Sequence, residues 1–203
     1  VIEDLGISRN SYEIFTDYGS FYDGVDVEPE GLIYSMEQGH EVVAHSPSVE
    51  RYVDFFAAQL KRAHTCIHIT MASSVSRGYE RASTAAASFD NVHVIDSETL
   101  SSGIGMIVKR AAKCASEGGS IERVLSEIES AKKSVRTSFV VDNIKYLDDA
   151  GRISRPVGQM AKVFPLHPIV IATKQHTKRH LCYAYYIANR QRFPSFRRHL
   201  GKL

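Results

Sequence analysis

Three serines lie close together at one corner of the sequence, within "ITMASSVSRGYERASTAAA" (residues 69–87). Ser73, Ser74 and Ser76 stand where a run of apolar and β-branched residues changes to an alanine-rich run. This change indicates a strand followed by a helix, and the first turn of a helix carries backbone N–H groups without intrahelical partners. These donors and the serine hydroxyls together predict a site for a carboxylate or a phosphate. The alternative is structural: one serine caps the helix and the other two face solvent.

No second group of residues forms a recognised catalytic, nucleotide or metal pattern. The sequence contains neither GxSxG nor GxGxxG nor GxxxxGK[ST], and close helix packing is a sufficient explanation of the "GIG" at Gly103 to Gly105. Cys66, Cys114 and Cys182 lack CxxC spacing and are expected to be buried thiols. The nine histidines show no ligand spacing. We therefore expect no catalytic residue, no metal and no cofactor.

The elements that position the serine corner alternate between short apolar runs and longer helical patterns. We expect strands at residues 12–15, 65–71, 91–97 and 137–142, and helices at 29–39, 48–60, 76–88, 101–117 and 120–135. This order indicates an α/β fold made of βαβ units, with a parallel sheet and helices on both of its faces. Ligands of such sheets bind at the carboxyl ends of the strands. That rule points to residues 72–76 and 96–105.

The length and composition describe a folded protein with a core of ordinary size. The chain has 203 residues and is 43% hydrophobic, which suffices for one domain, or one domain and part of a second. No stretch approaches the roughly 18 to 20 apolar residues of a membrane span, and the N-terminus does not resemble a secretory signal. We expect a cytoplasmic protein without a membrane span. Val1 is not a start methionine and the first residues read as mid-domain, which indicates either a fragment or a trimmed chain.

Charge is distributed unevenly along the chain. Residues 150–203 contain eleven Lys or Arg and no Asp or Glu, whereas residues 1–149 contain 14 basic and 23 acidic residues. Such polarity can steer an acidic partner, a phosphate or an anionic surface toward the basic end. Alternatively, the two halves neutralise each other in the folded protein or in a homodimer. No nucleic-acid-reading motif occupies the basic segment, so we do not expect a nucleic-acid partner.

Several stretches, taken in order, resemble the DegV family of bacterial fatty-acid-binding proteins. They are "YDGVDVEPEGLIYSM", "HSPSVERYVDFF", "ITMASSVSRGYERA", "VIDSETLSSGIGMIVKRAA", "FVVDNIKYLDDAGRIS" and "FPLHPIV". The resemblance implies a two-lobed α/β protein that holds one long-chain fatty acid between its lobes, with the carboxylate on hydroxyl groups. It further implies a carrier that is not itself an enzyme and that presents the acyl carboxylate to a separate ATP-dependent fatty acid kinase.

Carried over residue by residue, the resemblance assigns two sets of site residues. Ser73 matches the second of the family's paired serines, Ala72 stands at the first, and Ser74 replaces the glycine that follows. We expect the carboxylate to be held by Ser73, Ser74, Ser76, Ser46 and His45. We expect the pocket and its mouth to include Ala72, Ser101, Gly103, Gly105, Arg152 and His167.

The chain also departs from the family pattern. Ala44 stands where the family has a hydroxyl-bearing threonine, and the family's C-terminal motifs are not found after Ile171. We therefore predict a DegV-like α/β domain at residues 1–154. Residues 155–203 are predicted to be either the start of a second lobe or a divergent basic segment. In both cases the second lobe is incomplete or divergent. The alternative function is a ligand-free sensory or interaction module from a larger protein. The sequence leaves the acyl-chain preference open.

Overall fold

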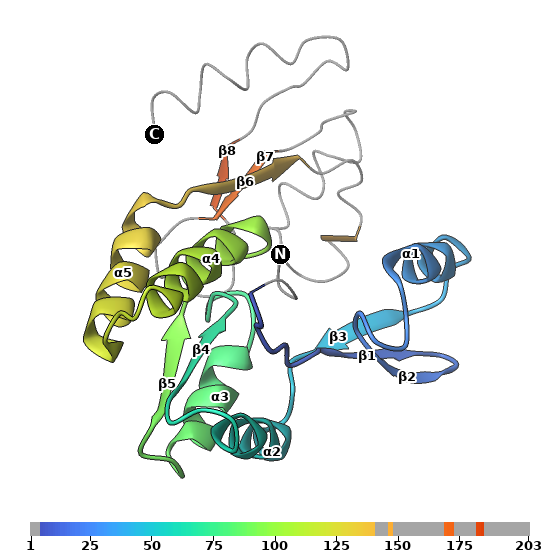
Figure 1. Cartoon of the computed structure of the whole chain (residues 1–203). Helices are drawn as coiled ribbons and strands as arrows, with labels where there is room; N and C mark the ends of the chain where they lie inside the picture. The colour runs from blue at the N-terminus through green and yellow to red at the C-terminus, as the bar shows by residue number, and fades with distance from the viewer. Residues whose placement is uncertain (1–4, 141–145, 148–168, 173–181, 185–203) are drawn as a thin grey trace.

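A computed structural model of the chain describes residues 5–140, 146–147, 169–172 and 182–184 (Figure 1). Two parallel strands, β4 (Cys66–Thr70) and β5 (Val92–Asp96), form its centre. Helices α2 (Val49–Leu60) and α3 (Gly78–Ala86) pack together, and so do α4 (Ser102–Ser116) and α5 (Ile121–Ser134). In the described residues, no helix is both long and apolar enough to cross a membrane.

Each face of the parallel pair is covered by one pair of helices, as the sequence predicts. Side chains alternate between the two faces of a strand. Ile67, Ile69 and Ile95 pack against the α4/α5 core, whereas Cys66, Val92 and Val94 pack against the core of α2 and α3. The α/β class with a parallel sheet and helices on both faces is therefore confirmed.

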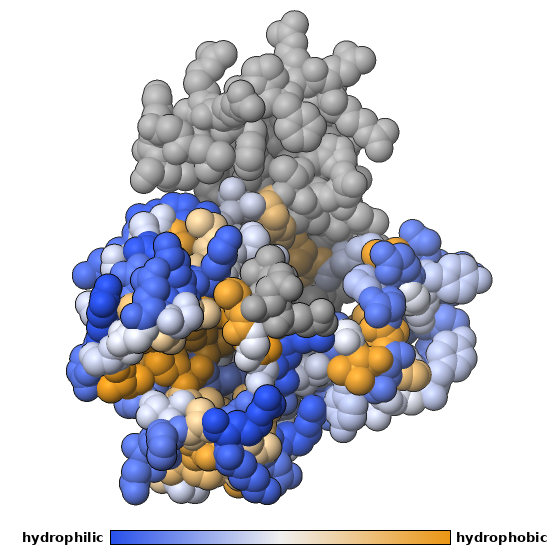
Figure 2. Space-filling model, viewed as in Figure 1, coloured by the Kyte–Doolittle hydropathy of each residue, from blue (hydrophilic) through white to orange (hydrophobic). Residues whose placement is uncertain are grey.

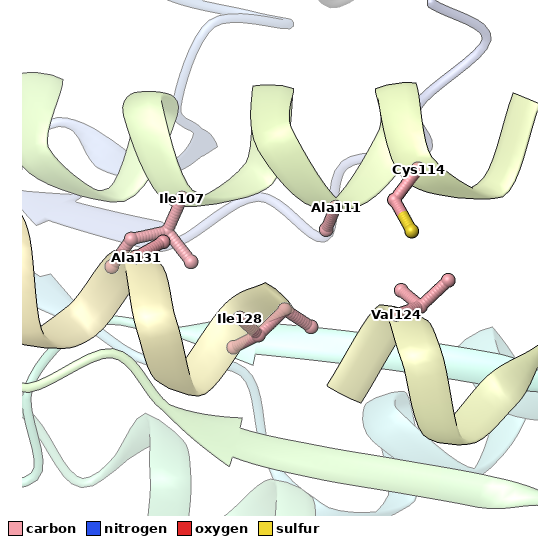
Figure 3. Close-up of a cluster of buried hydrophobic side chains, with 6 residues drawn as sticks. All are labelled: Ile107, Ala111, Cys114, Val124, Ile128 and Ala131. Atoms are coloured by element: carbon pink, nitrogen blue, oxygen red, sulfur yellow. The ribbon is translucent and has the colours of Figure 1, made fainter. Parts of the chain in front are cut away.

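Helices α4 and α5 form an antiparallel hairpin over the sheet. Ile107, Ala111 and Cys114 of α4 face Ala131, Ile128 and Val124 of α5, and all six are buried (Figure 3). Gly118 adopts a φ of +78° just after α4, and the Ser120 hydroxyl accepts from the backbone N–H of Arg123 at the start of α5. The glycine stop and the serine cap fit the two helices that the sequence predicts at residues 101–117 and 120–135.

The strand expected after α5 forms, but it does not join the parallel pair. β6 (Thr137–Val140) pairs antiparallel with β7 (Ile169–Ala172), which pairs antiparallel with β8 (Cys182–Ala184). The reason is that two consecutive helices separate β5 from β6. The first returns the chain to the start of the parallel strands and the second brings it back to their carboxyl ends, so β6 begins on the wrong side for a parallel crossover.

The N-terminal residues form a small antiparallel sheet that the sequence largely failed to predict. β1 (Glu13–Thr16) lies between β2 (Gly19–Tyr22) and β3 (Val42–His45), and α1 (Pro29–Glu37) precedes β3. Only β1 and α1 were expected. Figure 1 shows this sheet and α1 projecting from the side of the body. The predicted domain boundary at residues 154 and 155 lies outside the described residues.

Candidate functional site at the carboxyl ends of the parallel strands

The loops that follow β4 and β5 are tied together by hydrogen bonds. Thr70 and Asp96, the last residues of the two strands, are register partners. The Asp96 carboxylate accepts from the backbone N–H of Ser73, with N to Oδ1 at 3.2 Å, and from that of Glu98 at 2.9 Å. The Ala72 N–H donates to the Thr99 carbonyl at 2.9 Å. The serine corner therefore has a fixed position relative to the end of β5.

The serine corner is a turn rather than the first turn of a helix. The N–H groups of Val75 and Ser76 donate to the Ala72 carbonyl at 2.9 and 3.1 Å, and α3 begins at Gly78. Ser76 Oγ accepts from the Gly78 N–H at 3.1 Å. The expectation that the helix follows the serines directly was wrong by about two residues, because the Ala72 carbonyl closes a separate turn first.

Three donors of this turn remain available to a ligand. Ser73 and Ser74 are exposed, and in the described part of the chain neither hydroxyl nor the Ser74 N–H has a hydrogen-bond partner. The Ser73 N–H is not available, since Asp96 accepts from it. Arg77, just after the turn, is paired with Glu80 at 3.1 Å. The turn therefore offers neutral donors, which is the chemistry that a partly buried carboxylate requires.

Two tyrosines stand beside the start of α3. The Tyr12 hydroxyl and Ser76 Oγ are 2.5 Å apart, and a Cβ at Gly78 would lie 3.3 Å from the hydroxyls of both Tyr12 and Tyr52. Burial raises the pKa of Tyr52, and the nearby Tyr12 raises it further, so this phenol stays neutral. Tyr12 and Tyr52 were not predicted as site residues. The one sequence feature related to them is Gly78, which has no side chain to keep the two tyrosine hydroxyls away from the start of α3.

Ser46 and His45, although adjacent in the chain, have different surroundings in the structure. Ser46 is buried, and Arg81 Nη1 of α3 donates to its carbonyl at 2.6 Å, to its Oγ at 3.2 Å and to the Pro47 carbonyl at 3.3 Å. Arg81 therefore connects the loop before α2 to the helix that follows the serine turn. His45 is exposed on β3, where its ring lies 5.1 Å from that of Phe15. In the described residues no hydrogen bond joins His45 to the serine turn.

The loop between β5 and α4 is tightly packed and conformationally strained. A Cβ at Gly103 would lie 2.6 Å from Thr99 Oγ1 and would also contact Thr137 Oγ1, and these two hydroxyls are hydrogen-bonded at 2.7 Å. Glu98 and Ser101 have φ values of +55° and +53°, which side-chain-bearing residues rarely adopt. Close packing thus explains Gly103, as expected.

Gly105 does not share this explanation. No atom of the described residues lies within 4 Å of the position that its Cβ would occupy, and the residue is exposed. Ala72 is buried and Ser101 is exposed at the N-cap of α4. Arg152 and His167, the other predicted mouth residues, lie outside the described residues. Across the ranges that the structure describes, no group of three or more His, Cys, Asp or Glu could hold a metal ion.

A family model, described as "Uncharacterised protein, DegV family", matches residues 2–180. The chain belongs to the DegV family. A DegV domain-containing protein of Caldanaerobacter subterraneus subsp. tengcongensis is 30% identical over 172 residues, covering 84% of this chain and 61% of that relative. The chain thus spans about three fifths of the length of this relative.

Solved structures of the family share the fold at lower sequence identity. One, described as fatty acid binding of a DegV family protein from Thermus thermophilus, has a TM-score of 0.79 at 22% identity over 92% of this chain and 67% of that one. Another, a DegV family protein from Eubacterium eligens loaded with heptadecanoic acid, has a TM-score of 0.81 at 18% identity over 95% of this chain and 70% of that one. These likenesses establish the DegV fold for this chain.

Proposed function

We propose that this chain binds a long-chain fatty acid and holds its carboxylate at the serine turn, residues 73–76. The observation that carries the proposal is a set of three donors at one exposed turn that have no hydrogen-bond partner among the described residues: Ser73 Oγ, Ser74 Oγ and the Ser74 N–H. A carboxylate has two oxygens that accept several hydrogen bonds, so it matches this set. Descriptions of family members as fatty-acid-binding or loaded with heptadecanoic acid support the same ligand class.

The acyl chain would supply most of the affinity. Each buried CH₂ contributes roughly 0.8 kcal/mol, so a chain of about 14 buried methylenes contributes on the order of 10 kcal/mol before the costs of binding. Each hydrogen bond to the charged carboxylate adds about 1.5 to 3 kcal/mol. The hydroxyls therefore determine orientation and selectivity for a carboxylate. Ser46 is a weaker candidate for direct contact than Ser73, because Ser46 is buried whereas Ser73 is exposed.

We further propose that the protein is a carrier that presents the lipid to a separate fatty acid kinase. A serine becomes a nucleophile when a base accepts its proton. In the described ranges no histidine or carboxylate accepts from the hydroxyl of Ser73, Ser74 or Ser76, which favours binding over catalysis. The exposure of Ser73 and Ser74 would leave a bound carboxylate within reach of another enzyme. Free thiols at Cys66 and Cys114 are compatible with a reducing, cytoplasmic setting.

Mass spectrometry of the lipid extracted from the purified protein tests the binding proposal. We expect a stoichiometric long-chain fatty acid in the native protein and about tenfold weaker palmitic acid binding in Ser73→Ala, which loses one hydrogen bond to a charged group. Ser130→Ala, at an exposed position on α5, is the matched control and should bind normally. A folded native protein that stays empty after incubation with excess palmitic acid would favour the ligand-free interaction module instead.

A separate assay tests the carrier role. The lipid-loaded chain is incubated with ATP and Mg²⁺, and acyl phosphate is trapped with hydroxylamine as the hydroxamate. We expect no hydroxamate from the chain alone and a product only after a fatty acid kinase is added. Formation of acyl phosphate by the isolated chain would contradict the carrier proposal while leaving the binding proposal intact.

A further inference from the structure

The small N-terminal sheet and α1 carry charge of one sign only. Residues 11–45, here called the acidic lobe, contain eight Asp or Glu and no Lys or Arg. Seven of the eight are exposed, at positions 17, 23, 26, 28, 30, 37 and 41. A surface of this kind attracts cationic partners and repels nucleic acids, anionic membranes and free carboxylates. Its ligand class therefore differs from that of the serine turn.

Helix α1 presents an unpartnered apolar face within this acidic lobe. None of its residues is buried, and Ile33 and Tyr34 are 56% and 65% exposed. Residues three or four apart on a helix are neighbours, so Glu30 and Glu37 flank Ile33 and Tyr34 along the same face. Leu32 and Met36 are only half-buried on the rest of the helix. Figure 2 shows apolar surface adjoining hydrophilic surface on this lobe.

Within the residues that the structure describes, the flanking acids have no counter-charge. In the described part of the chain, neither Glu30 nor Glu37 takes part in an ion pair or a side-chain hydrogen bond, whereas Asp17 is bonded to His40 at 3.1 Å. An apolar centre inside a charged rim is the usual anatomy of a protein-binding surface. Opposite charge on the partner would speed association and fix its orientation.

We propose that this face of α1, made of Glu30, Ile33, Tyr34 and Glu37, docks another protein through a cationic segment with an apolar centre. Lysine or arginine side chains of that segment would pair with Glu30 and Glu37, and its apolar side chains would cover Ile33 and Tyr34. A cationic amphipathic helix has this chemistry. The proposal does not depend on lipid binding, since the serine turn contributes none of these residues.

Fluorescence anisotropy with a synthetic probe tests the proposal on the full chain. The probe is a labelled helical peptide built from Lys-Ala-Leu-Leu-Ala-Lys repeats, and the control peptide carries Glu in place of Lys. We expect the lysine peptide alone to bind, with affinity falling as salt rises. The double variant Glu30→Gln, Glu37→Gln should bind about tenfold more weakly and lose most of the salt dependence.

The apolar contribution is tested with the double variant Ile33→Ser, Tyr34→Ser, which should also bind about tenfold more weakly. The matched control replaces two exposed acids elsewhere, Glu117→Gln and Glu122→Gln, and should bind as the native protein does. Two results would overturn the proposal in favour of nonspecific ion pairing. One is that the Ile33→Ser, Tyr34→Ser variant binds the peptide as tightly as the native protein. The other is that the control variant loses as much affinity as the Glu30→Gln, Glu37→Gln variant.

Sedimentation at low and high salt tests whether the α1 face binds a different protein or a second copy of this chain. The basic residues 150–203 of a second copy offer an alternative source of cations. We expect the native protein and the Glu30→Gln, Glu37→Gln variant to sediment identically. Self-association that these substitutions abolish would assign the α1 face to a second copy and overturn the proposal of a different protein.

Discussion

The backbone N–H of Ser73 donates to the carboxylate of Asp96, with N to Oδ1 at 3.2 Å, across the ends of β4 and β5. Asp96 Oδ1 also accepts from the Glu98 N–H at 2.9 Å. One carboxylate therefore holds both loops at the carboxyl edge of the parallel strands. The serine turn depends on this acceptor for its position, so its donors are preorganised by a residue that does not itself need to contact a ligand.

Replacing Asp96 should affect both stability and ligand binding. Asp96→Ala leaves the N–H groups of Ser73 and Glu98 without their acceptor, and hydrogen bonds to a charged group contribute about 1.5 to 3 kcal/mol each when desolvated. We expect the free energy of unfolding in urea to fall by about 2 kcal/mol, and palmitic acid to bind several-fold more weakly. Asp90→Ala, at an exposed position before β5, is the control. An Asp96→Ala protein with native affinity would show that the turn forms without the carboxylate.

Alanine substitution at two glycines of α4 should change the stability of the protein in opposite directions. Gly103→Ala places a methyl group against the Thr99 and Thr137 hydroxyls, and overpacking of this kind costs about 1 to 3 kcal/mol. Gly105→Ala meets open space in the same helix and should stabilise it by up to about 1 kcal/mol, because alanine loses less backbone entropy. Thermal unfolding of the two variants measures the difference. Equal melting temperatures would contradict the tight packing at Gly103.

Lys132 of α5 is expected to stabilise the strained loop after β5. Its Nζ lies 3.1 Å from Glu98 Oε1 and 3.0 Å from Glu129 Oε1, and its side chain is only 9% exposed. Burial lowers the pKa of Lys132, but hydrogen bonds to Glu129 and Glu98 outweigh it and the net shift is upward, so the ammonium form is retained.

Lys132→Met should therefore destabilise the protein more than the neighbouring Lys133→Met, whose residue is exposed. We expect a loss of about 2 kcal/mol for Lys132→Met and less than about 0.5 kcal/mol for Lys133→Met in urea unfolding. If Lys132 stabilises the loop that contains Glu98, amide hydrogen exchange at residues 97–101 should be faster in Lys132→Met than in the native protein. Unchanged exchange there would assign the loss to α5 alone.

Sequence patterns predicted the elements whose signals are local. Apolar periodicity located α2 and α5, and the Ser48 and Ser120 hydroxyls accept from the N–H groups of Arg51 and Arg123, as caps do. β2 and β3 were missed because they are short and mostly exposed, without the alternation of apolar and polar residues that marks a half-buried strand.

The parts that could not be predicted depend on contacts between distant residues. The antiparallel pairing of β6 is set by β7, which lies almost thirty residues later in the chain. The Ser73 N–H is occupied because the register of β4 and β5 brings Asp96 beside it, and no feature of the serine cluster reveals that register. The hydrogen bonds of Arg81 to Ser46 and Pro47 likewise follow from the packing of α3 against α2. Local patterns located the serine cluster between β4 and α3, but only tertiary structure decides which of its donors are free.

His68 lies on β4 among three aromatic rings. Its ring centroid is 5.3 Å from that of Tyr52, 5.5 Å from that of Phe56 and 5.9 Å from that of Phe55. Burial lowers the pKa of His68 to about 4, from an ordinary value near 6.5 in the unfolded chain. The folded protein thus keeps this imidazole neutral over a range in which the unfolded chain binds a proton.

Stability should therefore decrease as the pH falls from about 6.5 toward 4. Above pH 6.5 both states carry a neutral His68, and below it proton binding favours the unfolded state by up to about 3 kcal/mol. Urea unfolding at pH 7.0, 5.5 and 4.5 measures this loss. Carboxylates also titrate in this range, so the diagnostic quantity is the difference between the native protein and His68→Leu, which should lack most of the decrease. His64→Gln, at an exposed position, should retain it, and a native pH dependence in His68→Leu would show that His68 is not its source.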